Sequence, residues 1–199
     1  IVGAGEVLAN DASLQVDRYV MPAEQRELHA QLSALPTASL DEIAVFVQPV
    51  PHKDRGADGP TAINVFEVGA ADIPSKGYIP RPERPISIQL SPRRSGDPMD
   101  VFLRPYDVVL IVKGSAGKVG VVPRNVPPPG NGGWIAGQSA IVLRSKSVKH
   151  DLRGLALWLR SPMGQTILDS IGSGAGVQML SIKELRRLGD ITGLDVWTE

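Results

Sequence analysis

The sequence contains no cysteine among its 199 residues. That absence excludes a disulfide scaffold, a cysteine nucleophile and every zinc site with cysteine ligands, and it fits a reducing compartment. Aromatic residues make up only 5% of the chain, too few for a surface that stacks single-stranded bases. The longest aliphatic run, residues 108–112, is far shorter than a membrane span. We therefore expect a cytoplasmic protein that does not enter a membrane.

Neither a start methionine nor a signal-peptide pattern is present, so the chain reads as a fragment of a longer protein. The formal net charge is zero, but its distribution is uneven. Residues 1–45 hold seven acidic and two basic side chains, whereas residues 46–130 hold eight acidic and eleven basic ones. A mildly basic body after an acidic lead-in can bind a polyanion, although a solvated mixed surface has the same composition.

The hydrophobic pattern predicts an α+β fold with mostly antiparallel strands and a few helices. Alternation indicates strands at 62–68 and 86–90, and strands at 108–112 and 119–122 flank a glycine-rich turn. Further strands are expected at 140–143 and 177–180. Spacings of three and four residues predict helices at 23–35, 39–46, 152–171 with a break at Pro162, and 182–188. No βαβ rhythm appears, which argues against a doubly wound sheet.

Two glycine-rich segments resemble nucleotide-binding loops without meeting their requirements. The segment 1–8 has Leu8 where a dinucleotide-binding fold needs its third glycine, and no βαβ unit follows. The turn from Gly114 to Lys118 has two residues between its glycines instead of four, and Val119 stands where a magnesium-binding Ser or Thr is needed. The turn is therefore either a plain tight turn or a turn that also contacts nucleic-acid phosphates.

Catalytic and metal sites have little support. The three histidines, His29, His52 and His150, are far apart and have no ligand cluster around them. No serine lies in a nucleophile-elbow context. We expect no catalytic residue, no metal and no cofactor in this chain.

An ordered set of segments resembles the target recognition domains of Type I restriction-modification specificity proteins. The set begins with 103–111 (LRPYDVVLI) and the turn 114–119 (GSAGKV). It continues with 140–144 (AIVLR), 155–161 (LALWLRS), 164–165, 172–174 and 177–185 (VQMLSIKEL). The resemblance covers about residues 37–190 and implies sequence-specific recognition of double-stranded DNA.

A second resemblance concerns the lead-in. Residues 10–20 (NDASLQVDRYV) are similar to the segment that ends the methyltransferase domain of adenine-amino DNA methylases. The catalytic Asn-Pro-Pro-aromatic motif of that family is absent. We expect residues 1–36 to be a methylase-tail-like lead-in with a connector helix, and 37–199 to be the recognition domain. The parent protein would use S-adenosylmethionine, and the partners that the resemblance implies are a methyltransferase domain and a restriction nuclease subunit.

The resemblance assigns the candidate site residues to two roles. The family keeps the glycine turn in proteins of different specificity, which implies a scaffold or phosphate role for Lys113, Gly114, Ser115, Gly117 and Lys118. The irregular region 48–100 should hold the base readers, because arginine and lysine can bind guanine in the major groove. The candidates are Lys53, Arg55, Lys76, Arg81, Arg84, Arg93 and Arg94, with Asn131 and Gln138 as weaker ones.

Two functions of other classes stay open from the sequence. A protein-interaction or regulatory domain would show a large apolar patch. A small-molecule enzyme would show a deep pocket with convergent ionisable groups. A continuous basic face would favour the DNA module.

Overall fold

A computed structural model describes residues 39–91, 97–148, 150–173 and 178–188. All of them belong to the second of the two units into which the chain divides, Ala38–Glu199. The expected helix at 23–35, the methylase-like segment 10–20 and the candidates Arg93 and Arg94 lie outside the described residues. The expected boundary between 36 and 37 therefore stays a prediction.

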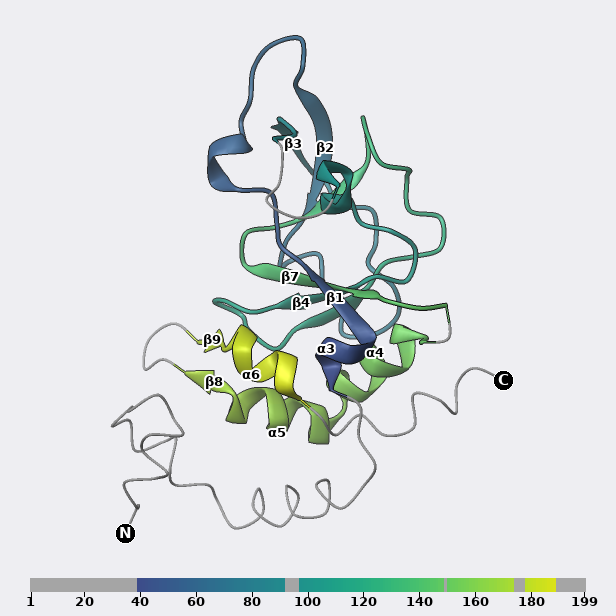
Figure 1. Ribbon diagram of the computed structural model, residues 1–199, viewed down its shortest axis with the longest axis vertical. Helices are drawn as coiled ribbons and strands as arrows, with labels where there is room; N and C mark the ends of the chain where they lie inside the picture. The colour runs from purple at the N-terminus through teal and green to yellow at the C-terminus, as the bar shows by residue number, and fades with distance from the viewer. Residues whose placement is uncertain (1–38, 92–96, 149, 174–177, 189–199) are drawn as a thin grey trace. The chain divides into compact units, whose positions relative to one another are not determined.

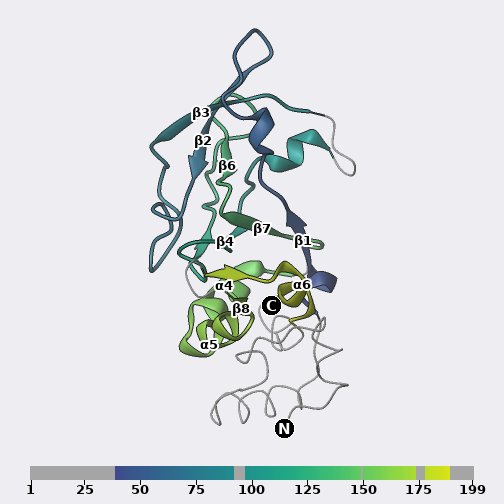
Figure 2. The same cartoon turned by 90° about the vertical axis from the view of Figure 1, so that its left-hand side faces the viewer.

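A four-stranded antiparallel sheet lies at the centre of the described unit (Figures 1 and 2). Its spatial order is β1-β7-β4-β5. The strands are β1 (Ala44–Val47), β7 (Ala140–Ser145), β4 (Val108–Ile111) and β5 (Val119–Val121). The β4–β5 hairpin that the sequence predicts around the glycine turn is confirmed, with Val108 opposite Val121 and Leu110 opposite Val119.

Both faces of this sheet are buried, which explains why β4 consists only of aliphatic residues. Val108 and Leu110 face one core, and Val109 and Ile111 face another, as the two-residue period of a strand requires. Helices cover the first face, and Figure 2 shows them grouped on one side of the sheet. They are α3 (Leu40–Ile43), α4 (Leu152–Arg160), α5 (Pro162–Ser170) and α6 (Ile182–Arg187).

A three-stranded sheet packs on the other face and contributes to two of the cores. Its order is β3-β2-β6, with β2–β3 antiparallel and β2–β6 parallel. The strands are β2 (Ile63–Val68), β3 (Arg84–Ile88) and β6 (Trp134–Ala136). Two short 3-10 helices, η2 (His52–Asp54) and η3 (Pro98–Val101), border this sheet, and a small third sheet joins β8 (Gly172–Ser173) to β9 (Met179–Leu180).

The α+β class with mostly antiparallel strands is confirmed, and so is the helix break at Pro162. Ser161 caps α5 by accepting a hydrogen bond from Gly164 N at 3.1 Å, and Pro162 occupies the first turn, where no amide hydrogen is needed. The helix expected at 39–46 is wrong beyond Ile43, because residues 44–47 form β1 instead. That strand pairs with β7, a partner so distant in sequence that no local pattern reveals it.

No described helix is long and apolar enough to cross a membrane. The described residues also contain no group of three or more His, Cys, Asp or Glu side chains that could hold a metal ion.

Candidate nucleic-acid interface

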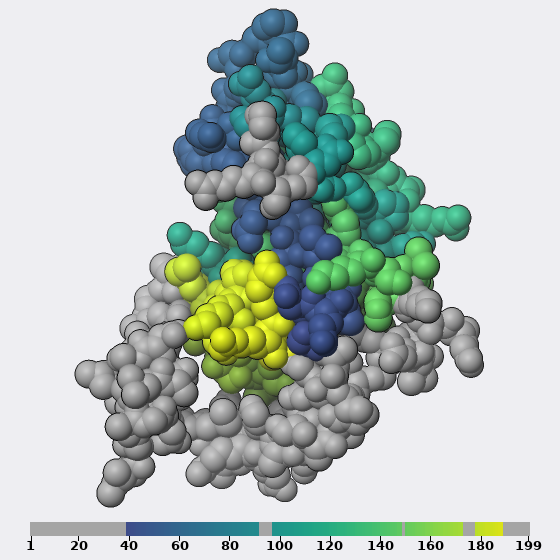
Figure 3. Space-filling model, viewed as in Figure 1, coloured from purple at the N-terminus to yellow at the C-terminus, as the bar shows by residue number. Residues whose placement is uncertain are grey.

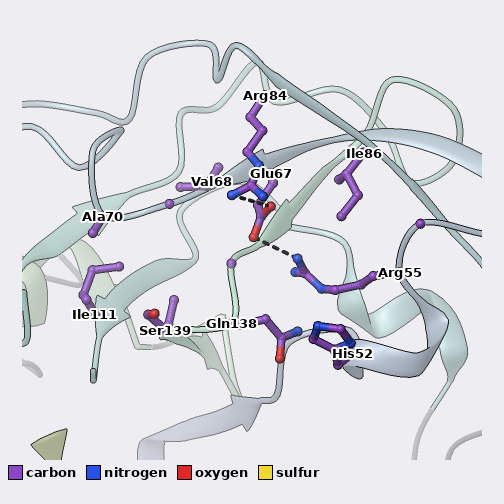
Figure 4. Close-up of a pocket in the computed structure, with 14 residues that line it drawn as sticks. His52, Arg55, Glu67, Val68, Ala70, Arg84, Ile86, Ile111, Gln138 and Ser139 are labelled. Carbon is purple, nitrogen blue, oxygen red and sulfur yellow. Dashed lines mark hydrogen bonds and ion pairs between the residues drawn. The ribbon is translucent and has the colours of Figure 1, made fainter. Parts of the chain in front are cut away.

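A pocket of about 430 Å³ opens between the two larger sheets (Figure 4). Residues of both sheets line it, together with η2 and the turn between β6 and β7. Its apolar side includes Val68, Ile86 and Ile111. Its polar side gathers six side chains: His52, Arg55, Glu67, Arg84, Gln138 and Ser139.

A buried carboxylate forms the floor of the polar side. Alternation along β2 predicts that Glu67 shares a face with Ile63 and Val65, and the Glu67 side chain is only 5% exposed. Nη1 of Arg55 donates to its Oε1 at 2.9 Å. The other guanidinium nitrogens of Arg55 donate to the carbonyls of Val50 at 3.2 Å and Ala136 at 3.1 Å. Arg55 thus has a partner for each guanidinium nitrogen, which offsets part of the cost of burying its charge.

A second arginine meets the same carboxylate from outside. Arg84 lies directly opposite Glu67 in the β2–β3 register, and its side chain is 75% exposed. Its Nη1 is 3.3 Å from Oε2 of Glu67. The ion pair is not aligned as a hydrogen bond, and Oε2 accepts no hydrogen bond within the described part of the chain. Because two guanidinium groups share one carboxylate, the Arg55–Glu67–Arg84 cluster keeps one positive charge.

The glycine turn lies at the edge of the same pocket. Lys113 N donates to the carbonyl of Ser139 at 3.2 Å, and Lys118 Nζ donates to the carbonyl of Ala70 at 3.2 Å. Ser139 and Ala70 both line the pocket. The fold thus joins the predicted phosphate-contacting turn to two residues of the pocket that Arg55 and Arg84 also line.

The turn itself has the backbone geometry that its glycines suggest. Gly114 and Gly117 have φ of +78° and +88°, the left-handed region that side chains with a Cβ resist. Gly114 N donates to the carbonyl of Gln178 at 3.0 Å, and the carbonyl of Gly117 accepts from Nε2 of Gln165 at 3.0 Å. Ser115 is exposed at the tip. The tight-turn interpretation is confirmed, whereas phosphate contact stays a prediction.

The remaining candidates divide into two groups. Lys53 is exposed on η2, beside the pocket residue His52. Lys76 and Arg81 lie elsewhere: the neighbour of Lys76, Gly77, accepts a hydrogen bond from Arg160 of α4 at 3.0 Å. Arg81 stacks on Phe66, 5.3 Å from the ring centroid, and Phe66 alternates with Glu67 along β2.

The weaker candidates both make contacts inside the fold. Asn131 accepts a hydrogen bond from Asn64 N at 3.1 Å. Gln138 lines the pocket, and its Nε2 donates to the carbonyl of Val50. Sequence reasoning passed over Glu67, although a carboxylate on the buried face of an alternating strand is a signal that it needs a cationic partner.

A second buried ion cluster lies near η3. Nε and Nη2 of Arg144 donate to the two carboxylate oxygens of Asp107 at 3.1 and 2.8 Å. Arg144 also donates to the carbonyls of Asp100 and Phe102, and Asp107 accepts from Arg104 N at 2.8 Å. Burial raises the pKa of the Asp107 carboxyl, and this effect exceeds the lowering by the hydrogen bonds from Arg144. The contacts join η3 to β7.

Comparisons with known proteins give similarity at the level of solved structures. The sequence matches no protein-family model and no curated protein. Three solved structures resemble the chain at TM-scores of 0.42 to 0.47. One is the S subunit of a Type-I restriction-modification system from M. genitalium, at 16% identity over 77% of this chain and 33% of that chain.

The other two cover more of this chain. The HsdS subunit from Thermoanaerobacter tengcongensis is 18% identical over 93% of this chain and 41% of that one. A structure described for the assembly and conformational transition of the type I R-M system is also 18% identical, over 93% of this chain and 42% of that one. The chain thus spans less than half the length of each of these three structures.

Proposed function

We propose that this chain is a recognition module for a specific sequence of double-stranded DNA. The observation that carries the proposal is one pocket that Arg84 lines and that the glycine turn contacts. The turn between β4 and β5 contacts two pocket residues, Ser139 through the backbone amide of Lys113 and Ala70 through Nζ of Lys118, and Arg84 of β3 lines the same pocket. A surface that combines exposed lysines with an arginine held by an ion pair suits phosphates and base edges together.

The lysines of the glycine turn and the cations at the pocket have different roles in this proposal. Lys113 and Lys118 neutralise DNA phosphates, which positions the module on the duplex without reading sequence. Lys53 and Arg84 face the bases. Arg55 supports them from inside, since its guanidinium is occupied by Glu67 and two carbonyls. Lys76 and Arg81 stay in the proposal as further contacts outside the pocket, and Arg93 and Arg94 stay in it as candidate base readers.

The resemblance of the sequence to specificity proteins suggests the setting in which this module works. It directs an adenine methyltransferase to its target site in a cytoplasmic restriction-modification system, together with a restriction nuclease subunit. Its partners are then double-stranded DNA and a methyltransferase domain in the same chain or complex. S-adenosylmethionine would be bound by the methyltransferase and not by this chain.

A titration with duplex DNA at several salt concentrations tests the proposal. The chain should bind duplexes at low salt, and each phosphate contact should contribute about −0.9 to the slope of log affinity against log salt. Lys118→Ala should weaken binding to all sequences alike and reduce the slope by about one contact. The mechanism is the loss of one counterion-releasing charge.

Arg187→Ala is the matched control. Arg187 is exposed on α6, which contacts α3 on the face seen in Figure 3, and neither helix contributes to the pocket. The substitution removes one positive charge from the helical side of the unit, so the slope should change little. An absence of binding to any duplex at low salt contradicts the proposal. An equal effect of both substitutions contradicts the assignment of the turn.

A further inference from the structure

In the Arg55–Glu67–Arg84 cluster, one arginine has all its hydrogen-bond partners within the protein, whereas the other is exposed to solvent. Arg55 has hydrogen-bond partners on all three guanidinium nitrogens and is 9% exposed. Arg84 contacts the cluster through Nη1 alone. Among the described residues, no hydrogen-bond partner is found for its Nε and Nη2. Arg84 therefore presents free donors of a planar fork while one side of that fork is held.

The element that holds Arg84 is rigid. Glu67 is fixed by the central position of β2, which pairs on both sides. Its partner Arg55 is fixed in turn, because the backbone of Arg55 bridges to Ile88 at the end of β3. Gly56 N also donates to Ser87 O at 2.8 Å, and Gln89 N donates to Asp54 O at 2.8 Å. The carboxylate that meets Arg84 thus has little freedom to move.

A guanidinium fork held in this way fits one kind of base edge. O6 and N7 of guanine are two acceptors side by side in the major groove, and an arginine can donate to both. Holding the side chain in advance lowers the entropy lost on binding and fixes the direction of the fork. The positive charge left on the cluster favours these acceptors and disfavours the amino groups of adenine and cytosine.

We propose that Arg84 reads one guanine of the target site through two hydrogen bonds, and that Glu67 is the positioning residue that orients it. This proposal rests on the proposed function. It goes further in naming one reader, one base and the buried carboxylate behind them.

Selection of binding sites from a random duplex library at low salt tests the proposal. The parent chain should enrich a motif with one guanine whose enrichment depends on Arg84, called the sensitive position below. At that position, Arg84→Lys should reduce the preference for guanine by up to roughly 140-fold, since one bidentate contact discriminates by about 5- to 140-fold and lysine lacks the planar fork. Arg84→Gln should shift the preference toward adenine, because glutamine pairs with its N6 and N7. Arg187→Gln, an exposed charge change on α6, should enrich the parent motif.

Two measurements separate base reading from effects on folding. With the parent chain, 7-deazaguanine at the sensitive position removes the N7 acceptor and should weaken binding, while the same replacement at other guanines should not. Glu67→Gln should reduce the preference at the sensitive position and leave the other positions enriched, in protein whose melting curve shows that it folds. A purely structural role for Glu67 would lower all preferences together.

The outcomes distinguish this proposal from the proposed function. A parent chain that enriches no sequence overturns the proposed function. A parent chain that enriches a motif unchanged by both Arg84 substitutions leaves that function intact and overturns the assignment of Arg84. Equal sensitivity to 7-deazaguanine at every guanine also overturns it.

Discussion

The two buried arginine–carboxylate clusters differ in whether their hydrogen bonds are complete. Asp107 and Arg144 are 3% and 11% exposed. The Arg144 guanidinium donates hydrogen bonds to the Asp107 carboxylate and to the carbonyl of Phe102, so both side chains have their partners within the protein. Glu67 is equally buried, but one of its oxygens meets only the exposed Arg84. The Asp107–Arg144 cluster, called the closed cluster here, joins η3 to β7. The Arg55–Glu67–Arg84 cluster, called the open cluster, leaves the Arg84 guanidinium and its donors at the surface. Completeness of hydrogen bonding therefore separates a structural ion pair from one that can serve a ligand.

The largest effect should come from breaking the closed cluster. Arg144→Ala should lower the free energy of unfolding by about 3–5 kcal/mol near neutral pH, because Asp107 would remain buried without its cation. The loss should be smaller at about pH 5. With the cation gone, the folded-state pKa of Asp107 lies further above the unfolded value, so the protonated carboxyl stabilises the fold at low pH, and this is lost as pH rises. Urea denaturation at both pH values measures the difference.

Arg104→Ala provides the comparison within the same cluster. Arg104 is 46% exposed and pairs with Asp100 at 2.7 Å. Exposed pairs contribute about 0–1 kcal/mol, so this substitution should have a small effect at either pH. A similar loss for both arginines would show that burial does not decide the stability of this cluster.

A medium effect is expected in the glycine turn, where backbone geometry and the proposed phosphate contacts coincide. Gly117→Val should cost about 1–3 kcal/mol, because φ of +88° disfavours a branched side chain. A Cβ there would also come within 3.3 Å of Gln165 Oε1. Gly114→Val is the matched control, since φ is +78° but no atom lies within 4 Å of its added Cβ. Thermal melting should place Gly117→Val below Gly114→Val, and melting of Gly117→Val like the parent would contradict the turn geometry.

The smallest effect on stability should come from removing the exposed arginine of the Arg55–Glu67–Arg84 cluster. Arg84→Ala should change the free energy of unfolding by less than about 1 kcal/mol, because the side chain is 75% exposed and Glu67 keeps Arg55. Denaturation by urea measures this change. A loss as large as that of Arg144→Ala would make the two clusters equivalent, and the comparison would fail.

The sequence predicted the elements whose pattern is local. The alternation from Ile63 to Glu67 places those side chains on one face, as the structure shows. The helix expected at 182–188 is likewise confirmed as α6, and the hydroxyl of Ser181 caps it by accepting a hydrogen bond from Glu184 N at 3.2 Å. Only nearby residues decide these features, so a single sequence is enough to predict them.

Elements that depend on distant partners were missed. Strand β6 has three residues and no alternation, and it exists because Phe66 of β2 pairs with Trp134. Arg55 was expected as an exposed base reader, and the structure places its guanidinium against Glu67 and the carbonyl of Ala136. Composition and spacing cannot distinguish a solvated arginine from one that the fold turns inward. No observation tests Arg55 as a base reader, and the function proposed above gives it a supporting role instead.

The order of the strands along the chain has a consequence for synthesis. The four-stranded sheet has the order β1-β7-β4-β5 and the three-stranded sheet the order β3-β2-β6, so the chain passes back and forth between the two sheets. A nascent chain that stops before Trp134 can form the β2–β3 pair and the β4–β5 hairpin, but β1 and β4 still lack β7. Both sheets then carry open strand edges, which other chains can pair with. Productive folding must therefore wait until β7 has emerged from the ribosome, and shortened forms of the domain should aggregate.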